Sequence, residues 1–242
     1  MARELSETHP INPQANLLKD ANHEIRMGFV RKVYGILSGQ LCLTVLVALP
    51  ILRMSQEQVR SNQWMLILST AAMVGTMCVM CCCQEVLRKF PTNYMVLGVL
   101  TVAMGIIVGF TSAMYTPQSV VLAAAVTAGI FFCMTLFAWT TKLDFTGFRI
   151  YFMAAGIALC VFGLAISILS CFTVVKWAIM AYDFLAVLLF TFYIVYDTQL
   201  ILGGDDRKAQ FGVDDYCFAA ISLYLDIINL FLHLLSLFGE RR

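Results

Sequence analysis

The chain has 242 residues, of which 60% are hydrophobic and 13% are charged, and its mean hydropathy is +0.82. This composition excludes an ordinary soluble domain and is typical of a protein that crosses a membrane several times. The formal net charge of +1 gives no indication of a nucleic acid or of an acidic soluble partner.

The first 26 residues are polar, contain Pro10 and Pro13, and lack the apolar stretch of a secretory signal peptide. We therefore expect a mostly disordered cytosolic tail over residues 1–26, followed by a transmembrane domain over residues 27–242. An alternative for the end of the tail is a short interfacial helix that begins near His23 and leads into the first span.

Seven apolar segments follow, each close to the roughly 20 residues that a transmembrane helix needs. No proline lies in the middle of a segment, which favours unbroken helices. The connections are short, so consecutive helices should pack as antiparallel neighbours. The sequence therefore predicts an all-α integral membrane protein with a seven-helix bundle. The predicted spans are 33–52, 64–83, 94–115, 119–140, 150–172, 177–202 and 216–238.

The basic residues predict the orientation of these spans. If the N-terminus is cytosolic, eleven lysines and arginines lie on the cytosolic side and five on the far side, in agreement with the positive-inside rule. Seven spans then place the C-terminus across the membrane. A re-entrant hairpin in place of the last span would instead return Arg241 and Arg242 to the cytosol, which charge counting also favours. The side of the C-terminus stays open at this point.

The nine cysteines show no metal-binding spacing, and we expect no tightly bound cofactor. Cys81, Cys82 and Cys83 end the second span on the cytosolic side. A juxtamembrane cluster of this kind is a candidate for S-palmitoylation. Cysteine is also a small hydrophobic packing residue, and that interpretation fits equally well.

Four ionisable side chains lie inside the spans: Asp183 and Asp197 in the sixth, and Asp226 and His233 in the seventh. A carboxylate at the centre of a helix costs roughly 2.5–3.5 kcal/mol on insertion scales. No lysine or arginine lies deep in a span, so each acid needs a proton, a cation or water. On a helix, Asp226 and His233 share one face with three further polar residues. This stripe indicates an ion path, or alternatively a polar seam that only holds helices together. Its other members are Ser222, Asn229 and Ser236.

The depths of the acids can be estimated from the helical rise. Asp197 should lie roughly 9 Å, and Asp226 roughly 15 Å, from the cytosolic ends of antiparallel helices, so their carboxylates could face each other. Asp183 should share the face of Asp197 but lie roughly 21 Å away, near the far mouth. Tyr193, one turn from Asp197, could hydrogen-bond it. A line of acids on adjacent helices indicates a path for cations or protons.

Two adjacent carboxylates have a characteristic chemistry. Because they cannot both ionise cheaply, the pair should share a proton near neutral pH and titrate as a unit. Loss of that proton frees hard oxygen ligands suited to Ca²⁺. The pair can therefore sense pH and select cations with the same atoms.

Two long motifs carry a family resemblance. Residues 196–200 (Tyr-Asp-Thr-Gln-Leu) and residues 219–231 (Ala-Ala-Ile-Ser-Leu-Tyr-Leu-Asp-Ile-Ile-Asn-Leu-Phe) resemble the transmembrane Bax-inhibitor-motif family, also called Lifeguard. Residues 25–34 and 141–146 match as well, and the similarity extends from about residue 24 to 239. The motif of the last span is the most specific, whereas the middle spans match mainly by hydropathy.

The resemblance implies a seven-helix fold with the last helix at its centre, and a pH-sensitive Ca²⁺ leak that suppresses cell death. It places Asp197 and Asp226 at the family's paired aspartates, and Asp214 and Asp215 at a cation-attracting mouth, where Asp205 and Asp206 add charge. The family's basic cluster after the second span is reduced here to Arg88 and Lys89. Arg88 is still a candidate latch that could pair with the aspartates, but at this point the chain departs from the family's pattern.

The implied location is an internal membrane, the Golgi or endoplasmic reticulum, with the plasma membrane or another organelle as alternatives. The implied partners are membrane lipids, Ca²⁺ and protons, and other membrane proteins that control cell death. Two alternatives remain: a non-conducting scaffold that regulates apoptosis by binding proteins, and a Ca²⁺/H⁺ antiporter that would use the same acids.

No enzymatic activity is expected. An intramembrane aspartyl protease also uses Tyr-Asp in one helix and Asp in the next, but its second site reads Gly-x-Gly-Asp. The corresponding residues here are Leu223, Tyr224, Leu225 and Asp226, and the chain lacks a Pro-Ala-Leu element. A seven-helix receptor is disfavoured by the short loops.

Overall fold

The computed structural model describes residues 23–83, 88–170, 172–173, 176–203, 208–209 and 211–242. Within these residues, seven helices are long and apolar enough to cross a membrane, as predicted. A short helix and a 3₁₀ turn lie between them. In chain order the elements are α1 (His23–Leu52), α2 (Gln56–Ser61), α3 (Gln63–Cys82), α4 (Thr92–Ser112), α5 (Pro117–Thr140), η3 (Phe145–Phe148), α6 (Arg149–Ser170), α7 (Lys176–Leu202) and α8 (Tyr216–Phe238).

The helix ends agree with the predicted spans to within a few residues, except at the start of α1. This helix begins at His23, ten residues before the predicted span and inside the predicted tail, whose residues 1–22 lie outside the described part. Helix α2 was not predicted because it is polar. It begins at a capping box in which Ser55 and Gln58 satisfy each other's backbone N–H groups.

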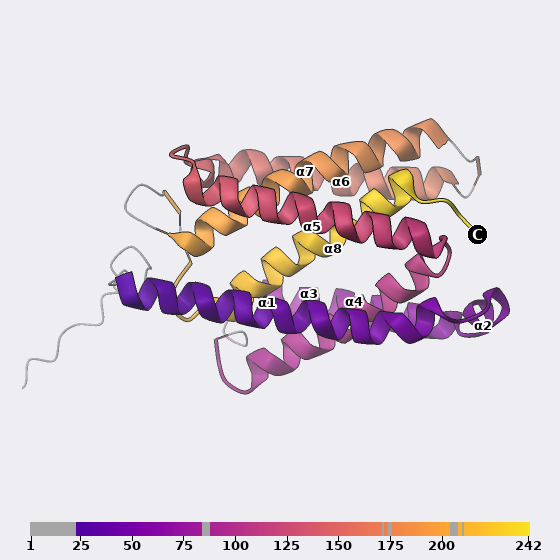
Figure 1. The fold of residues 1–242 in the computed structure, drawn as a ribbon, viewed down its shortest axis with the longest axis horizontal. Helices are drawn as coiled ribbons and strands as arrows, with labels where there is room; N and C mark the ends of the chain where they lie inside the picture. The colour runs from indigo at the N-terminus through magenta and orange to yellow at the C-terminus, as the bar shows by residue number, and fades with distance from the viewer. Residues whose placement is uncertain (1–22, 84–87, 171, 174–175, 204–207, 210) are drawn as a thin grey trace, which may run out of the picture.

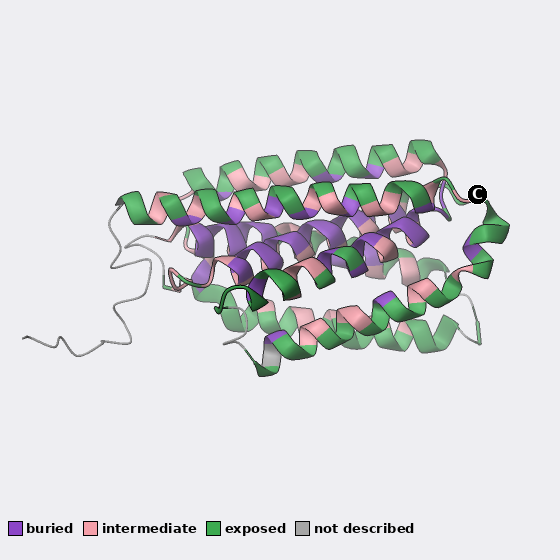
Figure 2. Cartoon of the chain, turned by 90° about the horizontal axis from the view of Figure 1, so that it is seen from below, coloured by how far each residue is buried: buried purple, intermediate pink, exposed green. Residues whose placement is uncertain are grey.

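Helix α8 is the centre of the bundle. Figure 1 shows it crossing between α1, α3 and α4 on one side and α5, α6 and α7 on the other, and α1, α4, α5 and α7 all pack against it. Buried positions are concentrated along this middle layer (Figure 2). The expectation of a central last helix is therefore confirmed. Helix α6 is the opposite case, because it packs on α7 and none of its 22 residues is buried.

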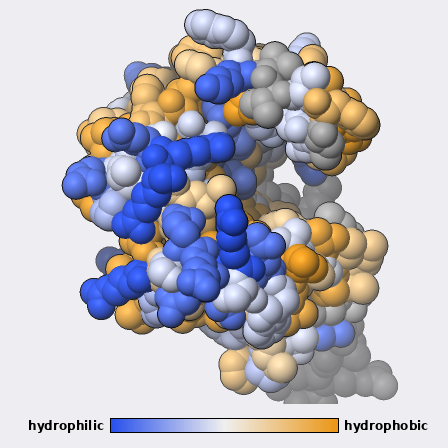
Figure 3. All heavy atoms as spheres, turned by 90° about the vertical axis from the view of Figure 1, so that its right-hand side faces the viewer, coloured by the Kyte–Doolittle hydropathy of each residue, from blue (hydrophilic) through white to orange (hydrophobic). Residues whose placement is uncertain are grey.

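Helix α1 begins at one end of the bundle, and the chain ends at Arg242 at the opposite end (Figure 1). We call the end where α1 begins the N-terminal face and the opposite end the far face. Helix α8 runs without a break from Tyr216 to Phe238, so the re-entrant hairpin considered for this segment is wrong. The two arginines of the C-terminus thus lie at the far face, where hydrophilic side chains gather between apolar flanks (Figure 3).

The C-terminal residues are fixed to the turn between α4 and α5. Thr116 N donates to Glu240 O over 2.9 Å, and Arg242 N donates to Met114 O over 3.0 Å. Glu240 N donates to Ser119 Oγ over 2.9 Å. These bonds hold the far end of α8 against α4 and α5.

Two glycines of α4 allow it to pack closely on α1. A Cβ atom at Gly105 would lie 2.9 Å from Val47 Cβ, and one at Gly109 would lie 3.1 Å from Ala48 Cα. Close approach at small residues separated by four positions is the usual packing mode of membrane helices, because it maximises van der Waals contact.

Buried polar side chains connect α1 to α4 and α8. Gln40 Nε2 donates to Thr101 Oγ1 over 3.1 Å, and the hydroxyls of Thr44 and Tyr224 are 2.7 Å apart. All four residues are buried. Such interhelical bonds satisfy groups that would otherwise be unpaired in an apolar medium, and they fix the position of the central helix.

Candidate functional site

Asp197 of α7 and Asp226 of α8 meet in the interior of the bundle. Their carboxyl groups lie close to each other, and the residues are only 8% and 7% exposed. Asp197 lies five residues before the end of α7, and Asp226 lies ten residues after the start of α8. Both are therefore in the half of the bundle nearer the N-terminal face, as the helical rise predicted.

The pair lacks a basic partner within the described residues, where no lysine or arginine forms an ion pair with either carboxyl group. Asp226 Oδ2 is buried and receives no hydrogen bond from any N–H or O–H group described. Two carboxyl groups can hydrogen-bond to each other only if one of them carries a proton. The arrangement therefore suits a shared proton, or a cation in its place.

Tyr193 lies beside this pair but does not donate to Asp197, so that expectation is wrong. Its hydroxyl donates to Phe152 O of α6 over 2.7 Å, and its ring packs on those of Phe152 and Phe190. The reason is the position of α6, where Gly156 leaves the space that the tyrosine hydroxyl fills. The hydroxyl thus joins α6 to α7.

Gln199 closes the N-terminal face beside the aspartate pair, a role that the sequence did not suggest. Its buried side chain accepts from Phe145 N over 2.8 Å and donates to Leu143 O over 2.9 Å. The loop between α5 and α6 is thereby fixed to the end of α7. The sequence does contain a sign of this role, because Gln199 is the only polar residue after Thr198 in the otherwise apolar last turn of α7.

Asp144 organises the same loop. Its carboxylate accepts from Thr146 N over 3.0 Å at the start of η3, and from Lys208 N over 3.2 Å. Ala209 N donates to Thr146 Oγ1 over 3.1 Å. The segment between α7 and α8 is therefore attached to the segment between α5 and α6, above the end of α7.

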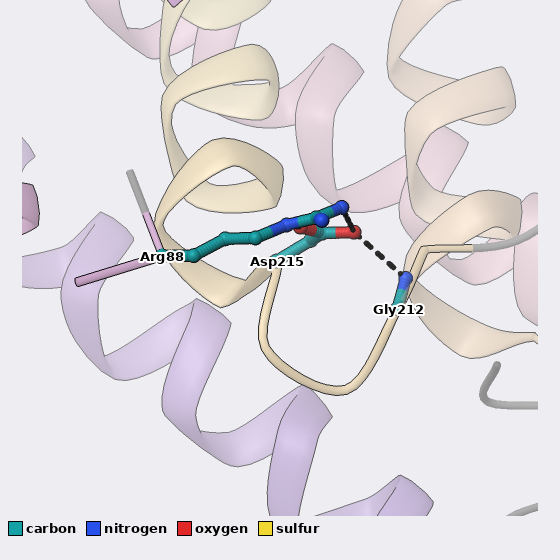
Figure 4. Close-up of polar contacts among 3 residues, drawn as sticks. All are labelled: Arg88, Gly212 and Asp215. Atoms are coloured by element: carbon teal, nitrogen blue, oxygen red, sulfur yellow. Dashed lines mark hydrogen bonds and ion pairs between the residues drawn. The ribbon is translucent and has the colours of Figure 1, made fainter. Parts of the chain in front are cut away.

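Arg88 forms a two-point contact with Asp215 at the start of α8 (Figure 4). Arg88 Nε lies 2.7 Å from Asp215 Oδ1, and Nη2 lies 3.2 Å from Oδ2, which also accepts from Gly212 N over 3.0 Å. The arginine expected as a latch thus binds a predicted mouth residue, and not Asp197 or Asp226. Asp214 is exposed, and Asp205 and Asp206 lie outside the described residues.

Asp183 and His233 meet in the far half of the bundle, together with Ser236. His233 Nδ1 lies 2.8 Å from Asp183 Oδ1, and Ser236 Oγ donates to Asp183 Oδ2 over 2.5 Å. Asn229, predicted on the same stripe, instead donates to Leu225 O of its own helix over 2.8 Å. The stripe of α8 therefore contacts α7 at two separate places.

The juxtamembrane cysteines are at the end of α3. Cys82 and Cys83 are exposed, as lipidation would require, whereas the side chain of Cys81 lies outside the description.

Sequence comparisons match nearly the whole chain. The family described as "Inhibitor of apoptosis-promoting Bax1" matches residues 26–242. Human Protein lifeguard 3 is 37% identical over 222 residues, which cover 91% of this chain and 71% of the relative, and the mouse protein is 35% identical with the same coverage. Protein LIFEGUARD 4 of Arabidopsis thaliana is 36% identical over 220 residues, or 89% of this chain and 85% of the relative. With its seven spanning helices, the chain belongs to the transmembrane Bax-inhibitor-motif (Lifeguard) family, whose members are membrane proteins linked to the regulation of apoptosis.

Proposed function

We propose that this protein is a pH-sensitive Ca²⁺ leak of an internal membrane, the Golgi or endoplasmic reticulum, and that the leak suppresses cell death. The supporting observation is the buried contact between Asp197 and Asp226, which has no basic partner among the described residues. When both carboxyl groups are protonated, the pair is neutral and attracts cations only weakly. Deprotonation leaves a buried negative charge that a hard divalent cation can neutralise with carboxylate oxygens.

The leak is tested with purified protein in liposomes that contain a Ca²⁺ dye. Wild-type protein should conduct Ca²⁺ with a strong pH dependence near neutrality. Asp197→Asn and Asp226→Asn should each flatten that dependence, because one acid alone cannot share a proton with its neighbour. They should also weaken Ca²⁺ binding by about tenfold or more, equivalent to at least about 1.4 kcal/mol.

Glu57→Gln is the matched control, because it removes an exposed carboxylate on α2 outside the pair. It should leave the pH dependence unchanged. If both aspartate variants fold and retain the pH dependence and Ca²⁺ flux of the wild type, the paired-aspartate mechanism is wrong. Proton movement coupled to Ca²⁺ in the opposite direction would instead identify a Ca²⁺/H⁺ antiporter.

The description of the family, an inhibitor of apoptosis-promoting Bax1, favours one other function. A scaffold could control apoptosis by binding another membrane protein without conducting ions. This function predicts no Ca²⁺ flux from protein alone in liposomes, and unchanged protection from cell death in Asp226→Asn.

A further inference from the structure

Asp183, His233 and Ser236 form a second polar contact between α7 and α8, which we call the far-half cluster. Asp183 is 4% exposed, and both of its carboxylate oxygens have partners on α8, His233 Nδ1 at 2.8 Å and Ser236 Oγ at 2.5 Å. The His233 side chain is 17% exposed. The cluster is thus fully bonded at the carboxylate and partly open at the imidazole.

The far-half cluster is well separated from the aspartate pair. Asp183 precedes Asp197 by fourteen residues on α7, which corresponds to roughly 21 Å of helix, and His233 follows Asp226 by seven on α8, or roughly 10 Å. Asp183 is seven residues from the start of α7, and His233 is five from the end of α8. The cluster is therefore nearer to the far face than the aspartate pair is.

Aromatic rings hold the imidazole in place. Phe190 stacks on it at 5.8 Å between ring centroids, and Tyr182 meets it edge-on at 5.4 Å. Both rings belong to α7, as Asp183 does. The imidazole is therefore confined to one orientation, with Nδ1 directed at the carboxylate.

Few other titratable groups face the cluster. Tyr182 is adjacent on α7, and Cys160 of α6 lies near Tyr182. The far halves of α1, α3, α4 and α5 contain one titratable side chain, Cys42. Among the described residues, no lysine or arginine is ion-paired with Asp183. The charged residues at this end are at helix ends, in α2 or in the C-terminal segment, and they are Arg53, Glu57, Arg60, Lys176, Glu240, Arg241 and Arg242.

We propose that the far-half cluster is a proton-binding site that makes the protein respond to pH at the far face, separately from the Asp197–Asp226 pair. Histidine is the side chain that ordinarily changes charge between pH 5 and 8. When His233 is neutral, Nδ1–H donates one hydrogen bond to Asp183. When it is protonated, a full charge in an apolar setting attracts the carboxylate. Acid at the far face thereby tightens α7 against α8 and reduces flux.

The proton-binding step is tested by NMR of protein in lipid nanodiscs with ¹⁵N-labelled histidine. The chain has three histidines, and His233→Asn identifies the relevant signals. Those signals should change as the pH is lowered and should show a hydrogen-bonded Nδ1 proton. Asp183→Asn removes the charge of the acceptor and should shift the hydrogen-bonded signal, and Ser236→Ala should shift it less, whereas His23→Asn should leave it unchanged. Signals that ignore pH, or that Asp183→Asn does not alter, would refute the site.

The effect on flux rests on the proposed leak and is measured separately, in liposomes whose two sides are set to different pH. Acid at the far face should reduce Ca²⁺ flux in the wild type, and His233→Asn should lose this response while keeping the response at the N-terminal face. Ser236→Ala, a smaller change, should weaken it, and Ser170→Ala at the far end of α6 is the matched control.

The outcomes separate the two proposals. A wild type without flux refutes the leak and leaves proton binding to be decided by the NMR result. A His233→Asn variant that conducts and still responds to far-face acid shows that the far-half cluster does not control the response. If His233→Asn does not fold, the same decision follows from Ser236→Ala, whose unaltered response would overturn the role in flux.

Discussion

Tyr193 lies next to the aspartate pair, but its hydroxyl is bonded to the backbone of α6. Tyr193→Phe removes the donor to Phe152 O and leaves the ring. We expect a loss of about 0.5–1.5 kcal/mol of stability, typical of one hydrogen bond, and no change in the pH dependence of flux. Thermal unfolding in detergent and liposome flux measure the two effects. A pH response altered as strongly as in Asp197→Asn would show that the hydroxyl serves the pair instead.

Arg88 neutralises the charge of Asp215 at the N-terminus of α8. Arg88→Gln leaves Asp215 unpaired beside Asp214, so the N-terminal face becomes more negative and should attract more Ca²⁺. Flux should rise most at low ionic strength, because the Debye length falls from about 30 Å at 0.01 M to about 8 Å at 0.15 M salt. Liposome flux over a salt series measures this change.

Lys142→Gln is the control for Arg88, because it removes a positive charge from the same face and leaves the Asp215 contact intact. An equal rise in both variants would mean that overall charge, and not the contact, controls entry. A salt-independent rise in Arg88→Gln alone would identify a mechanical latch.

The sequence was sufficient to predict which acids meet, but not all of their partners. Asp197 and Asp226 lie at calculable depths on consecutive antiparallel helices, so periodicity and rise bring them together. Arg88 and Asp215 are 127 residues apart, and nothing local indicates their contact. The hydroxyl of Tyr193 depends on the position of α6, which hydropathy does not determine.

At the level of helices, the contact between α1 and α4 depends on Gly105. Gly105→Ala places a methyl group against Val47, and overpacking of this kind costs about 1–3 kcal/mol. For a protein of this size, each kcal/mol lowers Tm by roughly 2–4 °C. Gly98→Ala on the same helix has no atom within 4 Å of the new Cβ and should change Tm little. Equal Tm values for the two variants would contradict the close approach.

The spans were predictable because long apolar runs have one stable form in a bilayer, the helix. The remaining elements were not, because they depend on polar side chains. Ser55 caps the start of α2, and Asp144 caps the start of η3, each by a hydrogen bond to the backbone. Both elements lie in short polar segments, so a hydropathy pattern does not detect them. The early start of α1 has a similar cause, since its first turns are amphipathic and place Phe29 in the core.

For the whole molecule, the structure predicts that its two ends lie on opposite sides of the membrane. A tag before His23 should be accessible from the cytosol when only the plasma membrane is permeabilised, as the distribution of basic residues indicates. A tag after Arg242 should be accessible only from the other side. Selective permeabilisation with antibody labelling measures both. Access to both tags from one side would contradict seven complete crossings. If antibody in the cytosol did not label the first tag, the predicted orientation would be wrong.

The central helix is also synthesised after the other six spans, and this has a consequence for assembly in the cell. Helix α7 carries two aspartates, each unfavourable inside the lipid, and their partners Asp226, His233 and Ser236 are translated only afterwards. Its apolar residues offset part of this cost. Helix α6 needs no such help, because it is the most hydrophobic of the seven spans and buries no residue. A ribosome that stalls before Tyr216 would therefore leave α6 in the lipid and α7 with two unpaired acids.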